Sequence, residues 1–401
     1  MSTLPIIIAI AGIVAISWAL WRPRTLATTA TTPTTATPET PETPETPATV
    51  GVSAQWSHAP GARLAVIIPA RDEADNLPAL FDCLARSEVR PHEVIVVDDG
   101  SSDDTAAIAA HEGAEVVPAG RLPAGWAGKP HACALGVAHS TGDVLVFLDA
   151  DVRLSSSALG LVLAELAARG GLVSVQPHHR PASWIEQLSA VFNVCAVAGS
   201  GAFTAGADRA DGAGRIAYGP CLAISRNDYL AVGGHAGVSG SVIEDIALAR
   251  ALEASGRSVS ALLGGDDLTY RMYPSGWRAM VQGWTKNIAR GAARAPLVPV
   301  LATVAWVAAM VATTIATVSG VVHWIAGGGV PWPALVAYAA IAVHAPWVLR
   351  RVGSFHVLTA LLFPIPVVFF VLVFLRSMSL AVLRRPVRWR GRVISPSRGA
   401  P

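Results

Sequence analysis

The sequence predicts an α/β domain with a mostly parallel sheet, flanked by N-terminal and C-terminal transmembrane helices. Three observations support this fold class. Short apolar runs typical of buried strands alternate with helical patterns between about residues 61 and 293. Hydrophobic residues make up 52% of the 401 residues and charged residues only 14%, which is too apolar for an ordinary soluble protein. Long stretches without charge lie on both sides of the alternating region.

Five apolar runs are expected to form strands of the sheet. They are LAVIIPA, EVIVVDDG, AEVVPA, VLVFLDAD and LVSVQP, which begin at residues 64, 93, 114, 144 and 172. Helical patterns such as NLPALFDCLARS (76–87) and SSALGLVLAELAARG (156–170) separate them. Continuous apolar strands joined by helices imply a parallel sheet covered on both faces, so ligands are expected at the carboxyl ends of the strands.

The N-terminal region, residues 1–24, is predicted to be a transmembrane anchor. The run from Leu4 to Trp21 contains no charge, and Arg22 and Arg24 then place its C-terminal end in the cytoplasm. A cleaved signal peptide is the alternative, but it would carry its basic residues before the apolar run. Residues 25–60, rich in Thr and Pro with a repeated PET triplet, are predicted to be a disordered linker.

The C-terminal region, residues 294–383, is predicted to hold further membrane segments. No charged residue occurs between Ala295 and Leu349, which leaves room for two spans, roughly 296–319 and 330–349.

A third apolar run, 355–374, precedes a basic tail, 384–401. The tail is expected in the cytoplasm, but a third full crossing would place it outside, against the positive-inside rule. A re-entrant hairpin at Pro364 and Pro366 remains an alternative to a third crossing.

Composition excludes several kinds of site. The net charge of +2 and the scattered arginines give no support for nucleic-acid binding. The four cysteines show no CxxC spacing, so neither a zinc site nor a disulfide framework is expected.

Three predicted strand ends carry charged residues, in the segments PARDEADN, DDGSSDD and DADVR. One such end is typical of an ordinary turn, whereas three at one sheet edge indicate a ligand site. Clustered carboxylates repel one another unless a cation or a donor-rich ligand lies among them. Mg²⁺ or Mn²⁺ bridging phosphates fits, because such ions are held by one or two carboxylates together with substrate oxygens. No glycine-rich phosphate loop follows a strand.

Several segments carry a resemblance to a known family: VIIPARDEADNLPAL, VIVVDDGSSDDT, GWAGKPHACALGVAHSTGDVLVFLDADV, YGPCLAISRNDYLAVGGH and VIEDIALARAL. Together they resemble the family 2 glycosyltransferases, which have a GT-A fold. The resemblance covers about residues 63–293 and is greatest to a membrane-bound branch that includes carotenoid-pathway and other lipid glycosyltransferases.

The resemblance implies roles for the matching residues. Asp98 and Asp99 would hold the base and ribose of a nucleotide sugar, aided by residues at the first strand end, namely Pro69, Arg71 and Glu73. Asp149 and Asp151 would form a D-x-D pair, with Asp151 as the metal ligand and Asp149 nearer the ribose or a metal-bound water. Asp72 stands where the family more often has Asn, and no role is assigned to it.

The resemblance also implies roles for the two acids of VIEDIALARAL. Asp245 would be the general base and Glu244 would support it, although acids also simply favour the first turn of a helix.

Lysine usage adds a separate indication, because Lys129 and Lys286 are the only lysines in the chain. A compact ammonium suits a phosphate, so Lys129 is expected to contact the diphosphate or the donor sugar.

The expected function is a membrane-bound, metal-dependent, inverting glycosyltransferase in the cell membrane, with its catalytic domain in the cytoplasm. It would move one hexose, glucose from a UDP donor, to a carotenoid or terpenoid acid or alcohol. QGWTKN stands where processive relatives carry Q-x-x-R-W, which favours single-sugar transfer. A hopanoid or glycerolipid acceptor remains an alternative. So do a phosphotransferase with Asp149 as nucleophile and a non-catalytic scaffold that binds a nucleotide sugar.

Overall fold

The computed structural model describes residues 2–21, 23–26, 62–204, 217–241, 243–274, 276–383, 387–389 and 392–394. The chain forms two compact units. The sheet unit comprises Arg24–Pro177 and Ala217–Thr269, and the helical unit comprises Met1–Pro23, His178–Ile216 and Tyr270–Pro401. The predicted linker lies outside the described residues except for Thr25 and Leu26.

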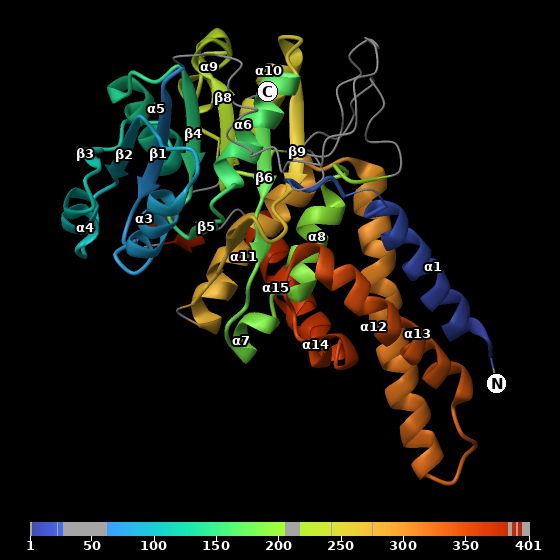
Figure 1. The fold of residues 1–401 in the computed structure, drawn as a ribbon. Helices are drawn as coiled ribbons and strands as arrows, with labels where there is room; N and C mark the ends of the chain where they lie inside the picture. The colour runs from blue at the N-terminus through green and yellow to red at the C-terminus, as the bar shows by residue number, and fades with distance from the viewer. Residues whose placement is uncertain are drawn as a thin grey trace, which may run out of the picture. The chain divides into compact units, whose positions relative to one another are not determined.

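A seven-stranded sheet forms the centre of the sheet unit (Figure 1), with strand order β3-β2-β1-β4-β8-β6-β9. Only β8 runs antiparallel to its neighbours β4 and β6, and the other pairs within this sheet are parallel. The five predicted strands and the mostly parallel sheet are therefore confirmed. The bounds are β1 (Leu64–Ala70), β2 (Glu93–Asp98), β3 (Glu115–Pro118), β4 (Val144–Leu148), β6 (Leu172–Gln176), β8 (Cys221–Ser225) and β9 (Val259–Leu263).

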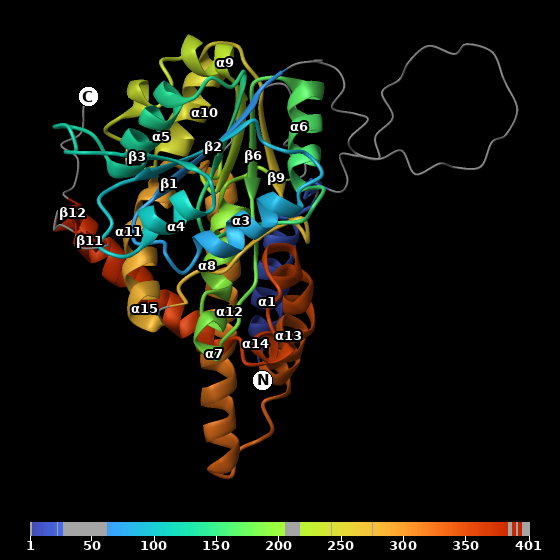
Figure 2. The ribbon, with the colours of Figure 1, turned by 60° about the vertical axis from the view of Figure 1, so that its left-hand side comes forward.

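Helices cover both faces of this sheet (Figure 2). On one face, Val66 and Val146 pack with α3 (Leu77–Arg86), α4 (Thr105–His111) and α6 (Ala158–Arg169). On the other, Ile67 and Phe147 pack with α5 (Gly128–His139), α9 (Arg226–Ala231) and α10 (Glu244–Ala254). Neighbouring residues of a strand point to opposite faces, so an unbroken apolar run supplies both cores.

Short elements complete the sheet unit. They are β5 (Val152–Leu154), the 3₁₀ helix η2 (Ala236–Val238) and the start of β10 (Leu268–Tyr270). Residues 24–26 lie beside β9, where the carbonyl of Arg24 accepts from the Leu263 N–H at 2.8 Å. The Arg24 side chain contacts the buried Glu165 carboxylate at 2.7 Å. Residues 24–26 are therefore held against the sheet.

The helical unit holds the apolar helices. Among the described residues, three helices are long and apolar enough to cross a membrane: α12 (Leu297–Ile325), α13 (Trp332–Val352) and α15 (Pro364–Val382). At 16 residues α1 (Leu4–Ala19) is shorter, about 24 Å long at 1.5 Å per residue. The other elements are β7 (His178–His179), α7 (Trp184–Gln187), α8 (Ala190–Gly199), α11 (Trp277–Arg294) and α14 (Val357–Leu361). Thus α7, α8 and α11 belong to this unit although their residues precede 294.

The two prolines of the third apolar run lie in the first turn of α15. Proline is tolerated there because the first helical N–H groups have no intrahelical partner. The third apolar run is thus divided, because α14 (Val357–Leu361) ends just before the prolines and α15 begins at Pro364 and continues to Val382. The choice between a third crossing and a re-entrant hairpin stays a prediction. In the tail, β11 (Val387–Trp389) and β12 (Arg392–Ile394) form an antiparallel pair.

Candidate active site

The three charged strand ends come from neighbouring strands. β1 pairs in parallel with β2 on one side and with β4 on the other, and Ala70 lies opposite Asp98. The carboxyl ends of the three strands therefore meet at one edge of the sheet, as the sequence predicts. Two groups of polar residues lie there, an aspartate cluster after β1 and β2 and a lysine cluster around the end of β4.

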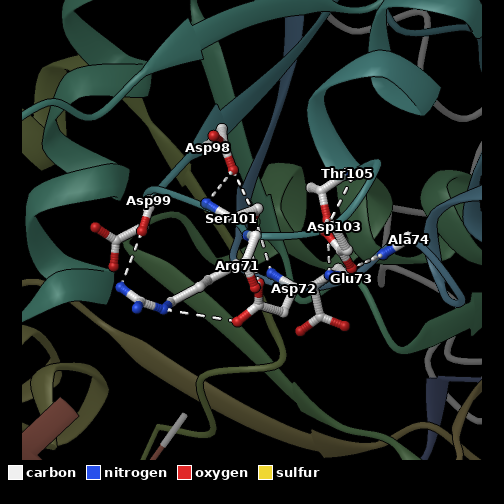
Figure 3. Close-up of polar contacts among 10 residues, drawn as sticks. Arg71, Asp72, Glu73, Ala74, Asp98, Asp99, Ser101, Asp103 and Thr105 are labelled. Carbon is white, nitrogen blue, oxygen red and sulfur yellow. Dashed lines mark hydrogen bonds and ion pairs between the residues drawn. The ribbon is translucent and has the colours of Figure 1, made fainter. Parts of the chain in front are cut away.

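The aspartate cluster consists of Arg71, Asp72, Asp98, Asp99 and Ser101 (Figure 3). Arg71 Nη1 donates to the main-chain carbonyl of Asp99 at 3.0 Å, and its Nε lies 3.9 Å from the Asp72 carboxylate. Asp98 accepts from the N–H of Ser101 at 3.1 Å and also from its hydroxyl. The N–H and the hydroxyl of Ser101, in the same loop, thus orient the Asp98 side chain.

Asp72, which the sequence left without a role, shapes this loop. Its φ of 52° lies in the left-handed region, which Asp tolerates better than most residues. Its N–H donates to the Ser101 hydroxyl at 3.0 Å, and its carboxylate accepts from the Ser102 N–H at 2.8 Å. Asp72 therefore ties the loop after β1 to the loop after β2.

Glu73 is buried and takes part in the same scaffold. Its N–H donates to Thr105 Oγ1 at 2.8 Å, and its carboxylate accepts from Asn76 Nδ2 at 2.8 Å. Nearby, Asp103 accepts from the Ala74 N–H at 3.1 Å. Burial raises the pKa of Asp103, but hydrogen bonds from Thr105 and Ala74 outweigh it and lower the pKa below its usual value. These contacts fix the start of α4, and the role of Glu73 in nucleotide binding stays a prediction.

Pro69 is the second-last residue of β1 and lies opposite Val97 of β2. Its ring fixes the backbone just before Arg71. The structure thus places Pro69, Arg71 and Glu73 along one segment that borders Asp98 and Asp99. Their contact with a nucleotide remains a prediction.

The lysine cluster joins residues that are far apart in the sequence: Lys129, Asp149, Gly219, Glu244 and Asp245. Lys129 Nζ lies 2.6 Å from Asp149 Oδ1 and 3.7 Å from Glu244 Oε1. It also donates to the carbonyl of Gly219 at 3.1 Å. One ammonium group therefore links the end of β4, the first turn of α10 and the segment that leads into β8.

Gly219 connects Lys129 to Asp245. Its carbonyl accepts from Lys129, and its N–H donates to Asp245 Oδ2 at 2.8 Å. A Cβ at this position would lie 3.0 Å from Lys129 Nζ and 3.1 Å from Asp245 Oδ2, closer than side chains normally approach. Sequence reasoning missed this residue, although YGPC was among the segments that carry the family resemblance.

The charges of the lysine cluster alter two pKa values. Burial, and then the Glu244 charge, raise the pKa of Asp245 to about 7, while Lys129 and two backbone N–H donors oppose the rise. Burial alone would lower the pKa of Lys129, but Asp149 and Glu244 outweigh it and raise that pKa. Near neutral pH Lys129 is therefore charged, and Asp245 has the affinity for protons that suits a general base.

The D-x-D pair occupies the turn between β4 and β5. The Asp149 N–H donates to the Pro220 carbonyl at 2.9 Å, and the Val152 N–H donates to the Asp149 carbonyl at 3.2 Å. In the part of the chain that the structure describes, no three His, Cys, Asp or Glu side chains gather closely enough to enclose a metal ion. The pair of carboxylates fits Mg²⁺ or Mn²⁺ shared with a ligand's oxygens, since both ions favour hard oxygen donors and keep few protein ligands.

Comparison with known proteins adds relatives to this geometry. The sequence profile described as Glycosyl transferase family 2 matches residues 65–229. The 4,4'-diaponeurosporenoate glycosyltransferase of Staphylococcus aureus strain MRSA252 is 32% identical over 342 residues, which cover 84% of this chain and 89% of the relative. The protein of the same name from strain USA300 is 33% identical over 343 residues, with the same coverage.

The chain belongs to glycosyl transferase family 2.

Family membership identifies this glycosyltransferase as an enzyme and its sheet unit as a GT-A fold, as predicted. It gives no support to a phosphotransferase or a non-catalytic scaffold. Solved structures with some similarity include a mannosyltransferase from Pyrobaculum calidifontis in complex with GDP-Man and Mn²⁺. It is 21% identical with a TM-score of 0.49, over 90% of this chain and 98% of that one. Glucosyl-3-phosphoglycerate synthase from Mycobacterium tuberculosis with Mn²⁺ and UDP is 19% identical with a TM-score of 0.41, over 62% and 86%.

Proposed function

We propose that this family 2 glycosyltransferase transfers one hexose from a nucleotide sugar, UDP-glucose, to a lipid-soluble acceptor in the cell membrane. The observation that carries the proposal is the lysine cluster. In it, Lys129 contacts both the D-x-D residue Asp149 and Glu244, which precedes Asp245. Such an arrangement brings groups suited to a diphosphate leaving group close to a base suited to an acceptor hydroxyl.

The nucleoside would bind at the aspartate cluster. Asp98 and Asp99 offer carboxylates at the end of β2, and Arg71 adds a positive charge beside them. Pro69 and Glu73 would shape the same wall. Ligands of open α/β sheets bind beyond the carboxyl ends of the strands, which supports this position for the base and ribose.

A divalent ion, Mg²⁺ or Mn²⁺, would be held by Asp151, with Asp149 nearby. When bound, such an ion stabilises the negative charge that develops on the departing diphosphate. Lys129 contributes a fixed positive charge to the same region because it is already held by Asp149 and Glu244. Its role is to orient Asp149 and to attract the phosphates.

Asp245 would act on the acceptor. An acceptor hydroxyl attacks the anomeric carbon opposite the diphosphate, which inverts that carbon, and Asp245 takes the hydroxyl proton. Burial, and then the charge of Glu244, raise the pKa of Asp245, and in this way Glu244 supports the step. An acceptor carboxylic acid is already ionised near pH 7 and would attack without that help.

The acceptor class follows from the relatives and from the membrane helices. The curated relatives are named for diaponeurosporenoate, whose name denotes a carboxylate. Three helices long and apolar enough to cross a membrane would keep the enzyme beside such a molecule. A carotenoid or terpenoid acid is therefore our first choice, and an alcohol of the same kind, a hopanoid or a glycerolipid is the alternative.

The sheet unit is proposed to lie in the cytoplasm, in a protein that crosses the membrane several times. Arg22 and Arg24 follow the first apolar run, and Arg350 and Arg351 end another. Arginines are enriched on the cytoplasmic side of membrane helices, where nucleotide sugars are available.

Mass spectrometry of lipid extracts tests this proposal. Extracts from cells that express the intact protein are compared with extracts from cells that express Asp245→Asn plus Asp151→Ala, a matched inactive control. We expect one lipid to gain the mass of a single hexose only with the intact protein. Unchanged lipids, together with sugar release from UDP-glucose that needs no lipid, would overturn the proposal.

A further inference from the structure

The helical unit contains a groove of about 750 Å³ between α1 and α13. Ser17 and Trp21 line it from the N-terminal segment, and α13 contributes Val336, Val343, His344 and Trp347. This volume falls within the range of sites that enclose small organic ligands. The catalytic residues described above belong to the sheet unit, so the groove is a separate feature.

One part of the groove is apolar and accessible. Val336 is 50% exposed and Val343 is 79% exposed. Both lie on α13, one of the three helices suited to cross a membrane. Ala339 and Ala340 lie between them and leave space because their side chains are small. This part of the groove is therefore suited to a hydrocarbon chain.

The same wall becomes polar toward the end of α13. Ser17 Oγ and His344 Nε2 lie 3.0 Å apart, and Trp347 follows three residues later in the groove lining. Tryptophan is enriched where the apolar part of a membrane meets its polar surface. The groove thus changes along α13 from a surface for a chain to a surface for a polar group.

Arg351 lies next to Trp347, at the polar end of the groove lining, and no ion pair joins it to an acid among the described residues. The guanidinium of Arg351 lies 3.9 Å from the centre of the Trp347 ring. Its Nε is buried and has no hydrogen-bond partner among the described residues. No Asp or Glu occurs in residues 1–24 or anywhere after residue 267. The helices that form the groove therefore supply no negative charge to this arginine, and an anionic ligand would complement it.

We propose that the groove binds a long-chain carboxylic acid, with its chain along Val336 and Val343 and its carboxylate at Arg351. Arginine pairs with carboxylates through two parallel hydrogen bonds, and Ser17 and His344 offer further polar contacts beside the head. The bound acid extends the proposed function if it is the acceptor of the sugar. A single chain is preferred to a two-chain phospholipid because the apolar lining residues of α13 form one strip.

Photo-cross-linking tests the binding without any donor sugar. The full chain is placed in nanodiscs of phosphatidylcholine and exposed to a diazirine-bearing palmitic acid or to the matching alcohol. We expect the acid to label peptides of α1 and α13 about tenfold more than the alcohol, as loss of a hydrogen bond to a charged group implies. Unlabelled palmitic acid should compete.

Matched variants locate the site. Arg351→Gln should reduce acid labelling to the level of the alcohol, whereas Arg350→Gln, which changes the adjacent exposed arginine, should leave it unchanged. Ala340→Trp should fill the groove and reduce labelling by both probes, and Val318→Trp on the exposed face of α12 is its control. The Ala340 variant keeps the test decisive if Arg351→Gln does not fold.

Three results would overturn the inference: equal labelling by acid and alcohol, labelling that neither groove variant reduces, or full competition by phosphatidylglycerol in the nanodisc. The proposed function is judged by sugar transfer, which is measured separately. Labelling without transfer would refute the function and leave the groove, whereas transfer without labelling would refute the groove alone.

Discussion

The aspartate cluster and the lysine cluster lie at the same sheet edge but are stabilised differently. Asp98 accepts hydrogen bonds from Ser101 three residues away, and Arg71 donates to the Asp99 carbonyl and lies 3.9 Å from the Asp72 carboxylate. In the lysine cluster, Lys129 reaches Asp149 at 2.6 Å and the carbonyl of Gly219, 90 residues further along the chain. The first cluster is organised within its own loops, whereas the second depends on one cation shared among distant segments.

This difference separates binding from chemistry. The loop donors of Ser101 hold the Asp98 side chain in place for a ligand. A buried set of charges shifts pKa values, and only the lysine cluster contains a carboxyl group whose pKa is raised to about 7. Changes to the lysine cluster should therefore reduce the rate of reaction, and changes to the aspartate cluster should mainly weaken donor binding.

Asp245→Asn should have the largest effect. With an alcohol acceptor, loss of the general base should lower kcat by about 10²- to 10⁴-fold. With a carboxylic acid acceptor, kcat should change little, because no proton must be removed. Steady-state kinetics with an acid and its matching alcohol measure both cases.

A pH profile provides the control for this prediction. A base must be deprotonated to act, and the pKa of Asp245 is raised to about 7 by burial and Glu244. With the alcohol acceptor, kcat/KM should therefore rise with pH up to about 7 and then level off, and Asp245→Asn should abolish that rise. A profile that is the same in both proteins would show that Asp245 is not the base.

Lys129→Met should have the next largest effect. Removal of the ammonium leaves Asp149 and Glu244 without their shared cation. Asp149 then loses its orientation, and the positive charge that attracts the phosphates of the donor is gone. We expect kcat/KM to fall by about 10- to 100-fold, in line with the loss of a charged hydrogen bond. Lys129→Arg serves as the comparison, since it retains the charge but not the compact shape. Equal activity of Lys129→Met and the parent would contradict the role of this lysine.

Gly219→Ala should have a smaller effect of the same kind. The added Cβ would lie 3.0 Å from Lys129 Nζ and 3.1 Å from Asp245 Oδ2, so both side chains must shift. A loss of about 1.4 kcal/mol corresponds to a tenfold lower kcat. The same substitution in a Lys129→Met background should cost less, because one of the two close contacts is then gone. A full additional loss in the double variant would mean that the glycine and the lysine act independently.

Ser101→Ala should have the smallest effect. It removes the hydroxyl that donates to Asp98 and accepts from the Asp72 N–H, while the Ser101 N–H still holds Asp98. Loss of about 0.5–1.5 kcal/mol should raise KM for the donor by about 2- to 10-fold, with kcat nearly unchanged. A drop in kcat as large as that of Lys129→Met would remove the distinction between the clusters.

Much of the sheet edge was predictable from local patterns. The runs that form β1, β2 and β4 are apolar and have charged residues at or just after their ends, and a parallel sheet brings those ends together. The sequence pattern alone could therefore place Asp98, Asp149 and Asp151 at one edge of the sheet. The run CLAIS of β8 was missed because five residues after a proline carry little periodicity, and its antiparallel position in the sheet is decided by pairing with β4 and β6.

The contacts of Lys129 were beyond sequence reasoning for a similar reason. Its scarcity in the chain indicated a function, but its partners Asp149, Gly219 and Glu244 come from separate elements and meet only through tertiary packing. Glu73 likewise has contacts that its motif did not predict, since its N–H donates to Thr105 Oγ1 and its carboxylate accepts from Asn76 Nδ2. The end of α1 was also not evident from the sequence. The apolar run continues to Trp21, whereas the helix ends at Ala19.

Metal-dependent donor binding tests the central claim most directly. UDP-glucose is titrated by calorimetry into the full chain in nanodiscs, with Mn²⁺ and then with a chelator, for the parent, Asp151→Ala and the surface control Asp82→Ala. We predict binding to the parent and to Asp82→Ala only when Mn²⁺ is present, and no binding to Asp151→Ala despite an unchanged circular dichroism spectrum. Binding that persists in Asp151→Ala, or in the parent without a metal, would contradict the account.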